Sequence, residues 1–140
     1  MKQTIAMTAL AVQDLERSLA FYAAAFDWKP VFQNEAVAFF QMNGFFFSLA
    51  TQELLENELE EKLQFGSNSF TIAHIVASEE EVDSIIRHAN QNGARLLQEP
   101  VKRDWGGYSG YLADPDGHKW EIAWNPFWKV SPEGYVSLGE

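Results

Sequence analysis

Residues 110–126 read GYLADPDGHKWEIAWNP, which has the pattern of a strand, a tight turn and a returning strand. In the turn, Pro115 presets its own backbone angle, and Asp114 can accept hydrogen bonds from the backbone that follows it. Gly117 supplies the backbone angles with which the return strand begins. A structural role therefore accounts for the DPDG sequence, which also lacks the ligand alternation of a calcium loop.

Alternation along the return strand separates one acidic side chain from three large apolar ones. Successive side chains of a strand point to opposite faces, so Glu121 lies opposite the residues that we expect in the core, Trp120, Ile122 and Trp124. On the preceding strand, either Tyr108 or Tyr111 shares the face of Glu121, depending on whether the hairpin contains a bulge. The sequence alone leaves this choice open.

The same order of elements occurs twice along the chain. The first unit has a strand in 4–12, a helix in 14–26 that Asp14 caps, and extended runs at 29–33, 35–42 and 45–51. The second unit starts about 65 residues later, with a strand in 69–78, a helix in 79–91, and extended runs at 94–100, 107–115 and 118–125. Each unit is therefore predicted to be a βαβββ module.

We divide this single domain, residues 1–140, into four parts. The first module spans 4–51 and the second spans 67–125. Between them, 52–66 contains five glutamates from residue 53 to residue 61 among leucines, which is typical of an exposed amphipathic linker helix with a solvated face. The segment 126–140, with two prolines, two glycines and three aromatic residues, predicts a surface arm without regular structure.

Composition excludes several classes of function. The 10 Lys and Arg residues against 20 Asp and Glu give a net charge of −10, which repels phosphate backbones and anionic membranes, so we expect no nucleic-acid or membrane partner. The absence of Cys excludes disulfides, thiolate metal sites and a cysteine nucleophile. The N-terminal apolar run is too short for a signal peptide or a membrane span, and we expect a cytoplasmic protein.

Three features together resemble the vicinal oxygen chelate superfamily, which includes glyoxalase I, extradiol dioxygenases, fosfomycin-resistance proteins and bleomycin-resistance proteins. They are VQDLERSLAFY at 12–22, DWGGYSGYLADPDGHKWEIAWNP at 104–126, and the paired βαβββ order. The chain is similar to small glyoxalase-like members with WGGYSGY and DPDGHxWE sequences. The resemblance implies an α+β fold in which two βαβββ modules form a curved mixed sheet with a concave cleft.

Where members of this superfamily bind a metal ion, His or Glu side chains converge from the first and last strands of both halves. By resemblance, these positions fall on Met7, Ser48, Thr71 and Glu121. A thioether and two hydroxyls are poor ligands for a divalent cation, so only Glu121 matches the pattern. We therefore expect no metal cofactor, with a site that uses displaced ligands such as His74 as an alternative.

The resemblance places Glu121 in the cleft, where its carboxylate accepts a hydrogen bond from a ligand or removes a proton. A carboxylate held away from water has a raised pKa, which a base near neutral pH requires. A charged residue at an accessible strand end is the structural alternative. The ligand-binding residues that we expect are Met7, Ser48, Thr71, Trp105, Tyr108, Tyr111 and Glu121.

The leading functional expectation is a protein that binds a small apolar or aromatic molecule without a tightly bound metal, as bleomycin-binding relatives do. One alternative is a lyase or isomerase that acts next to a carbonyl, with Glu121 as base and Tyr108 or Tyr111 stabilising the developing charge. A second alternative is a metal-dependent glyoxalase or dioxygenase. Relatives commonly form homodimers, so we also expect a homodimer.

Overall fold

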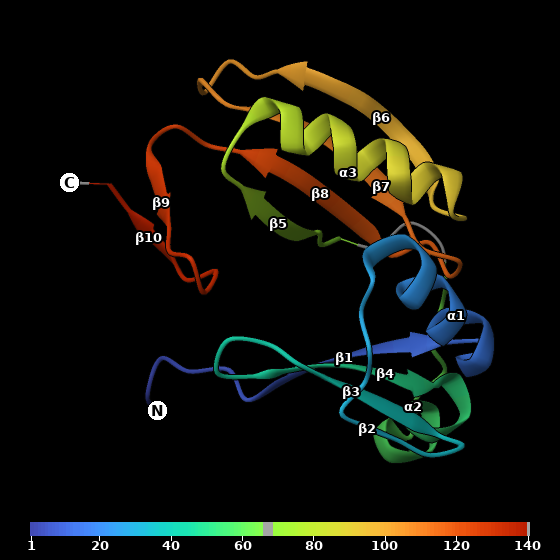
Figure 1. Cartoon of the computed structure of the whole chain (residues 1–140). Helices are drawn as coiled ribbons and strands as arrows, with labels where there is room; N and C mark the ends of the chain where they lie inside the picture. Colours follow the sequence, from blue (N-terminus) through green and yellow to red (C-terminus); the bar gives the residue numbers. More distant parts are fainter. Residues whose placement is uncertain (66–68, 140) are drawn as a thin grey trace.

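The chain folds as two βαβββ modules, each with its own four-stranded sheet (Figure 1). The computed structural model describes residues 1–65 and 69–139. The first module comprises β1 (Met7–Val12), α1 (Leu15–Phe26), β2 (Phe32–Gln33), β3 (Val37–Gln41) and β4 (Phe46–Thr51). The second comprises β5 (Ile72–Val76), α3 (Glu79–Gln91), β6 (Arg95–Lys102), β7 (Tyr108–Ala113) and β8 (Lys119–Trp124). These elements confirm the predicted α+β fold class.

Both sheets repeat one topology, in the orders β1-β4-β3-β2 and β5-β8-β7-β6. In each sheet the first strand of the module pairs in parallel with the last, and the remaining pairs are antiparallel. Within the described residues, no strand ladder joins the two sheets. The parallel pairs leave β1 and β5 as edge strands.

The helices begin where polar side chains satisfy their first backbone N–H groups. The Asp14 carboxylate accepts from the N–H of Arg17 at 3.0 Å, and the Ser78 hydroxyl accepts from the N–H of Glu81 at 3.2 Å. The linker helix α2 (Gln52–Leu59) is shorter than predicted and ends at Glu60, which has a φ of 56°. The module boundary predicted at residue 67 lies outside the described residues.

None of the helices in the described part of the chain is long and apolar enough to cross a membrane.

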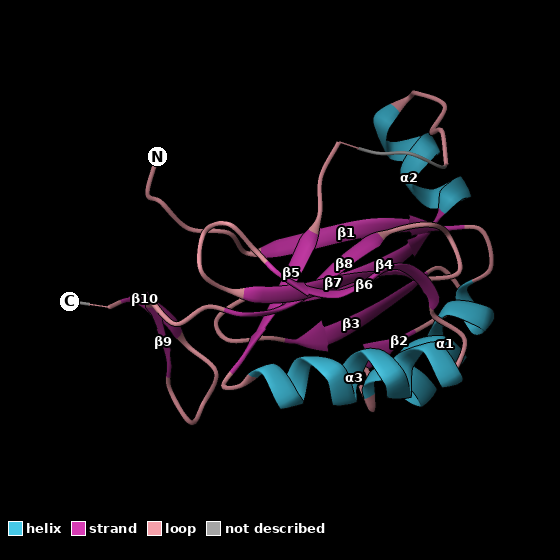
Figure 2. Ribbon diagram, turned by 90° about the horizontal axis from the view of Figure 1, so that it is seen from above, coloured by secondary structure: helices cyan, strands magenta, loops and turns pink. Residues whose placement is uncertain are grey.

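The two modules pack against each other through the faces that carry α1 and α3. Figure 2 shows both of these helices on one side of the sheets, with α2 on the opposite side. The ring of Phe47, from β4, lies 5.6 Å from that of Trp120, from β8, and Tyr22 of α1 contacts both. Because side chains alternate, the neighbours Ser48 and Glu121 point away from this shared core. We call the two sheet faces that carry Ser48 and Glu121 the outer faces.

The DPDG turn connects the two modules through buried hydrogen bonds. The Asp114 carboxylate accepts from the backbone N–H groups of Asp116 and His118, at 3.0 and 2.9 Å, as the sequence predicts. It also accepts from the Tyr22 hydroxyl at 2.7 Å, and that hydroxyl accepts from the Trp120 indole at 3.2 Å. Burial first, and the Asp114 charge second, raise the pKa of Tyr22 well above its ordinary value.

The next carboxylate of this turn holds the start of α1. Asp116 accepts from the backbone of Gln13, from the Arg17 guanidinium and from the Ser18 hydroxyl, at 3.0, 3.1 and 3.2 Å. His118 is buried, with its Nε2 2.8 Å from the carbonyl oxygen of Ala11 on β1. The two residues are 107 positions apart in sequence, so no local pattern indicates this burial.

The C-terminal segment forms a two-stranded hairpin, whereas the sequence predicts no regular structure there. Strands β9 (Trp128–Val130) and β10 (Val136–Leu138) pair antiparallel, with Gly134 in the connecting turn at a φ of 89°. The side-chain amide of Asn43, in the β3–β4 turn, donates to the Glu133 carbonyl at 2.8 Å. The hairpin therefore reaches from the second module to the first (Figure 1).

Candidate functional site

The outer face of the second sheet presents a tyrosine–carboxylate pair. Tyr111 on β7 lies directly opposite Glu121 on β8, and its hydroxyl donates to Glu121 Oε2 at 2.6 Å. This hydrogen bond is the main cause of the raised pKa of Tyr111, followed by burial and by the charge of Glu121. The pair therefore fixes the position of the carboxylate and leaves Glu121 Oε1 as an acceptor for another group.

Arg103 adds a fixed positive charge beside this pair. Its guanidinium carbon lies 5.5 Å from the centre of the Tyr111 ring, a cation–π arrangement. Three hydrogen bonds hold it there, to the hydroxyl and carbonyl oxygens of Ser109, at 2.8 and 3.1 Å, and to the side chain of Gln98, at 2.7 Å. Sequence reasoning missed Arg103, because β6 contains register shifts that no local pattern indicates.

The register of β7 and β8 decides which tyrosine joins Glu121. The two strands pair without interruption from Tyr108 opposite Trp124 to Ala113 opposite Lys119, so residues three positions apart face opposite sides. Tyr111 is therefore on the outer face and Tyr108 is on the helix-bearing face. The Tyr108 hydroxyl donates to Asp83 of α3 at 2.6 Å, and this hydrogen bond is the main cause that raises its pKa to about 12.

Two other expected ligand-binding residues belong to the second module. Thr71 is exposed and precedes β5, in which Ala73 lies directly opposite Glu121, so alternation places Thr71 on the outer face. Trp105 is 46% exposed, and its ring packs over Gly107, where an added Cβ would lie 1.8 Å from a ring atom. The glycine is therefore required by the adjacent indole of the same chain.

Met7 and Ser48 lie on the outer face of the first sheet, away from Glu121. Met7 is 47% exposed and pairs with Phe46, whereas Ser48 is buried and donates to the Thr8 carbonyl at 2.8 Å. An aromatic row crosses this face, with Phe32 and Phe39 centroids 5.5 Å apart and Phe39 and Phe46 centroids 5.7 Å apart. We call Phe32, Phe39 and Phe46 the phenylalanine row.

The four positions that resemblance assigns to a metal do not fit a tightly held divalent cation. Met7 offers a thioether, the Ser48 hydroxyl is buried and already bonded, and Thr71 offers a neutral hydroxyl. Glu121 is the one carboxylate, and one of its oxygens is bonded to Tyr111. Within residues 1–65 and 69–139, no group of three or more His, Asp and Glu residues could hold a metal ion.

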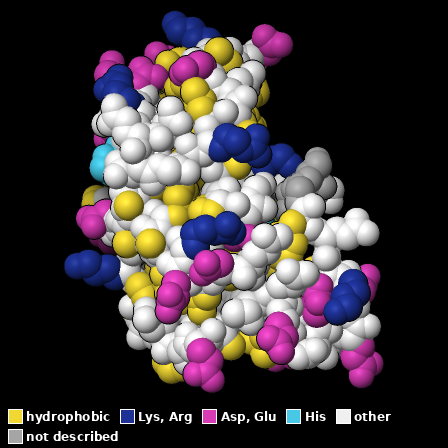
Figure 3. Space-filling model, turned by 90° about the vertical axis from the view of Figure 1, so that its right-hand side faces the viewer, with side chains coloured by type: hydrophobic (Ala, Val, Ile, Leu, Met, Phe, Trp, Pro, Cys, Tyr) yellow, Lys and Arg dark blue, Asp and Glu magenta, His cyan; other side chains and the backbone are white. Residues whose placement is uncertain are grey.

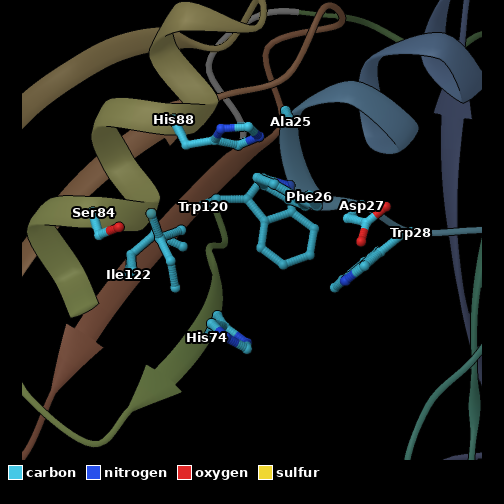
Figure 4. A pocket seen from close by; sticks show the side chains of 10 residues that line it. Ala25, Phe26, Asp27, Trp28, His74, Ser84, His88, Trp120 and Ile122 are labelled. Atoms are coloured by element: carbon cyan, nitrogen blue, oxygen red, sulfur yellow. The ribbon is translucent and has the colours of Figure 1, made fainter.

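An aromatic cavity is present, but it lies on the helix-bearing side. It has a volume of about 270 Å³ and lies between α1, α3, β5 and β8 (Figure 4). Trp120 and His74 line it, and His74 pairs with Ile122 in the sheet, which places His74 on the helix-bearing face. Burial lowers the pKa of His74, with an opposing contribution from Glu81. The aromatic cavity and Glu121 are thus on opposite faces of one sheet.

Comparison with known proteins identifies the family. Residues 4–122 match the model of the Glyoxalase/Bleomycin resistance protein/Dioxygenase superfamily. A metallothiol transferase FosB of Lysinibacillus sphaericus is 29% identical over 86% of this chain and 81% of its own length. A FosB of Bacillus licheniformis is 30% identical over 80% of this chain and 69% of its own length. A glyoxalase-related enzyme from Fulvimarina pelagi has a structure with a TM-score of 0.94, 37% identity, and coverage of 99% of this chain and 100% of that one.

Proposed function

Because the chain belongs to the Glyoxalase/Bleomycin resistance protein/Dioxygenase superfamily, we propose that it binds a small apolar or aromatic molecule at the Tyr111–Glu121 pair without a tightly bound metal ion. The hydrogen bond of 2.6 Å between Tyr111 and Glu121 carries this proposal. It holds a carboxylate on an outer face with one oxygen free to accept from a ligand. A neutral hydroxyl, an amide or a protonated amine is the matching ligand group.

The donor set argues against the metal chemistry that the name of the FosB relatives implies. A stable divalent site usually takes at least three nitrogen, oxygen or thiolate ligands from the protein. The positions assigned by resemblance offer one carboxylate, one thioether and two hydroxyls, at Glu121, Met7, Ser48 and Thr71. We therefore assign the ligand's affinity to hydrogen bonding and to apolar contact.

A second copy of the chain completes the proposed site. Phe32 is 50% exposed and Met7 is 47% exposed, an apolar surface of the kind that marks an interaction site. If this surface covers the Tyr111–Glu121 pair of a second copy, the reverse contact forms as well, as two-fold symmetry requires. The phenylalanine row then supplies the apolar wall that the outer face of the second sheet lacks. The free edges of β1 and β5 are compatible with this pairing.

Charge supports neutral or cationic ligands over anionic ones. The chain has a net charge of −10, and Figure 3 shows acidic side chains spread over one face of the molecule with Lys and Arg among them. At the site itself, Glu121 supplies a carboxylate, and Arg103 is held against Tyr111 and Ser109. The free oxygen of Glu121 therefore faces the ligand as the acceptor.

Three naphthalene compounds of equal size test the proposal: 2-naphthylmethylamine, 2-naphthylmethanol and 2-naphthoate. Calorimetry should give saturable binding in the order cation, alcohol, anion, unchanged by EDTA. Glu121→Gln, which keeps an acceptor for Tyr111, should remove the preference for the cation and leave binding of the alcohol within about twofold. Binding that requires added Zn²⁺, Ni²⁺ or Mn²⁺, or a cation preference that survives Glu121→Gln, contradicts the proposal.

Oligomeric state tests the contribution of the second copy. Phe39→Asp places a charge in the middle of the phenylalanine row, so sedimentation should shift from dimer toward monomer and binding of 2-naphthylmethanol should weaken. Glu35→Ala, a surface change near the same strand, is the control and should alter neither. A wild-type chain that sediments as a monomer at micromolar concentration excludes the shared site.

A second candidate function is proton removal next to a carbonyl. The observation that favours it is Arg103, which places a positive charge by the Tyr111–Glu121 pair where an enolate would form. Exchange of the α-hydrogens of hydroxyacetone in D₂O, followed by proton NMR, tests this activity. Exchange that is faster than buffer and lost in Glu121→Gln supports it, and exchange at the rate of buffer alone rejects it.

A further inference from the structure

We propose that the space between the two modules is a second ligand site, for a flat aromatic molecule that carries one cationic nitrogen. This site is on the helix-bearing side, opposite Glu121, so it goes beyond the proposed function. Two cavities of about 270 and 530 Å³ share Asp27, Trp28 and His74 in their walls and therefore adjoin. We call the combined space the inter-module cleft.

Aromatic rings form one wall of the inter-module cleft. Trp28 follows α1 and Trp120 is on β8, and their ring centroids are 5.5 Å apart with planes at 76°. Phe26 lies edge-on to both, with centroids 5.4 Å from Trp28 and 5.0 Å from Trp120. Figure 4 shows these residues around the inner part of the cleft. A planar ligand can pack against such rings in the edge-to-face or offset arrangements that aromatic groups prefer.

Two polar side chains in the cleft, His74 and Asp27, can bind a nitrogen-bearing group of the ligand. Among residues 1–65 and 69–139, the structure gives the His74 ring no hydrogen-bond partner. His74 lines both cavities, and a neutral imidazole donates from one ring nitrogen and accepts at the other. The Asp27 carboxylate lies beside Trp28 and supplies a negative charge for a cation (Figure 4).

We call the cavity of about 270 Å³ the inner cavity and the cavity of about 530 Å³ the outer cavity. Two further polar residues, His88 and Ser84, line the inner cavity. His88 is already occupied, with its Nε2 3.0 Å from the Ala24 carbonyl oxygen. Ser84, on the exposed side of α3, also lines the cavity. In the outer cavity Lys29 and Glu133 carry opposite charges, and Asp27, which lines both cavities, adds a further negative charge. Asp27 is therefore a carboxylate that lines both cavities, and it lies beside Trp28 of the aromatic wall (Figure 4).

The C-terminal hairpin forms the outer wall of the inter-module cleft. Glu133, Gly134 and Val136 line the outer cavity, and the hydrogen bond from Asn43 to Glu133 fastens the hairpin to the first module. Tyr135 and Val136 are 59% and 48% exposed, so little apolar packing holds this wall in place. Loss of the Asn43 amide is therefore expected to make the wall easier to displace.

Titration with 9-aminoacridine tests the site, because Trp28 and Trp120 should report binding by quenched fluorescence. We expect saturation at one molecule per chain, with weaker binding of neutral acridine and weaker still of acridine-9-carboxylate. Asp27→Asn should remove the preference for the cation. Ser84→Phe, which fills the cleft from α3, should raise the dissociation constant at least tenfold, whereas Gln91→Phe at the exposed end of the same helix should leave it within twofold.

Three further variants distinguish binding in the inter-module cleft from binding at the Tyr111–Glu121 pair. His74→Leu, which keeps the bulk and removes the ring nitrogens, should weaken binding severalfold, and Asn43→Ala should speed dissociation severalfold. Glu121→Gln should have no effect, so failure here and failure of the proposed function are distinguishable. The proposal is overturned if binding does not saturate below 1 mM, if Ser84→Phe binds like the wild type, or if Glu121→Gln weakens binding instead. An unchanged dissociation rate in Asn43→Ala removes the hairpin from the site.

Discussion

The two faces of β8 differ, because one packs into the core and the other presents the Glu121 carboxylate. On one face, Trp120 and Ile122 are 3% and 1% exposed and belong to the core that joins the two modules. On the other, Glu121 is half-buried, bonded to Tyr111, and open to an additional partner. At the Tyr111–Glu121 pair, adjacent residues therefore contribute separately, with Trp120 and Ile122 in the core and Glu121 available to a ligand. A change at Glu121 can therefore be made with little effect on the packing of the core, and the reverse holds for binding at Glu121.

Trp120→Ala should cause the largest loss of stability on this strand. It removes a buried ring that contacts Tyr22, Phe26, Trp28 and Phe47, and large-to-alanine changes of this kind cost about 3–5 kcal/mol. Glu121→Ala, the matched change on the outer face, should cost less than ~1 kcal/mol. Urea unfolding followed by circular dichroism measures both. Similar losses in the two variants would show that the faces are not separate.

Tyr22→Phe should have the next largest effect, because it removes the hydrogen bond from α1 to Asp114 of the DPDG turn while keeping the ring. It leaves the Asp114 carboxylate without one donor and the Trp120 indole without its acceptor, at a cost of about 2 kcal/mol. Ser18→Ala, which removes one of three donors to Asp116, is a milder change at the same junction. A loss in Tyr22→Phe below that in Ser18→Ala would contradict this ranking.

Alkaline pH should weaken the packing between the two modules through the ionisation of Tyr22. The pKa of Tyr22 is raised in the folded protein, so its contribution is complete below pH ~10 and decreases as the pH rises above the value of the unfolded chain. The free energy of unfolding should therefore fall above pH ~10. In Tyr22→Phe the fall should be shallower, because only the other tyrosines with raised pKa values, Tyr108 and Tyr111, still contribute. If the free energy of unfolding fell equally with pH in the wild type and in Tyr22→Phe, the ionisation of Tyr22 would not be the cause of the fall.

Tyr108→Phe should have the smallest effect and shows why the register matters. Its hydroxyl bonds to Asp83 in a partly exposed position on α3, so its loss should cost less than ~1 kcal/mol and leave naphthalene binding unchanged. Tyr111→Phe should instead weaken the binding of 2-naphthylmethylamine severalfold, because Glu121 loses its positioning partner. Calorimetry of the two variants against one ligand distinguishes them. Equal losses of affinity would place both tyrosines at one site.

Local patterns predicted the elements because their causes are local. Asp14 begins α1 through its own side chain, Asp114 and Gly117 form the turn, and alternation assigned Trp120 and Glu121 to opposite faces. Each of these outcomes depends on residues within about five positions along the chain. The resemblance of the whole chain to a known family added the pairing of the two modules.

The sequence by itself determined the two βαβββ modules, the strand that carries Glu121, and the poor metal-donor character of Met7, Ser48 and Thr71. Only the tertiary structure decided that Tyr111 and Arg103 accompany Glu121, and that the aromatic cavity lies on the other side of the sheet. The physical reason is distance along the chain. Strand register, bulges in β6 and the packing of one module on the other depend on contacts between residues far apart in sequence, which periodicity does not encode.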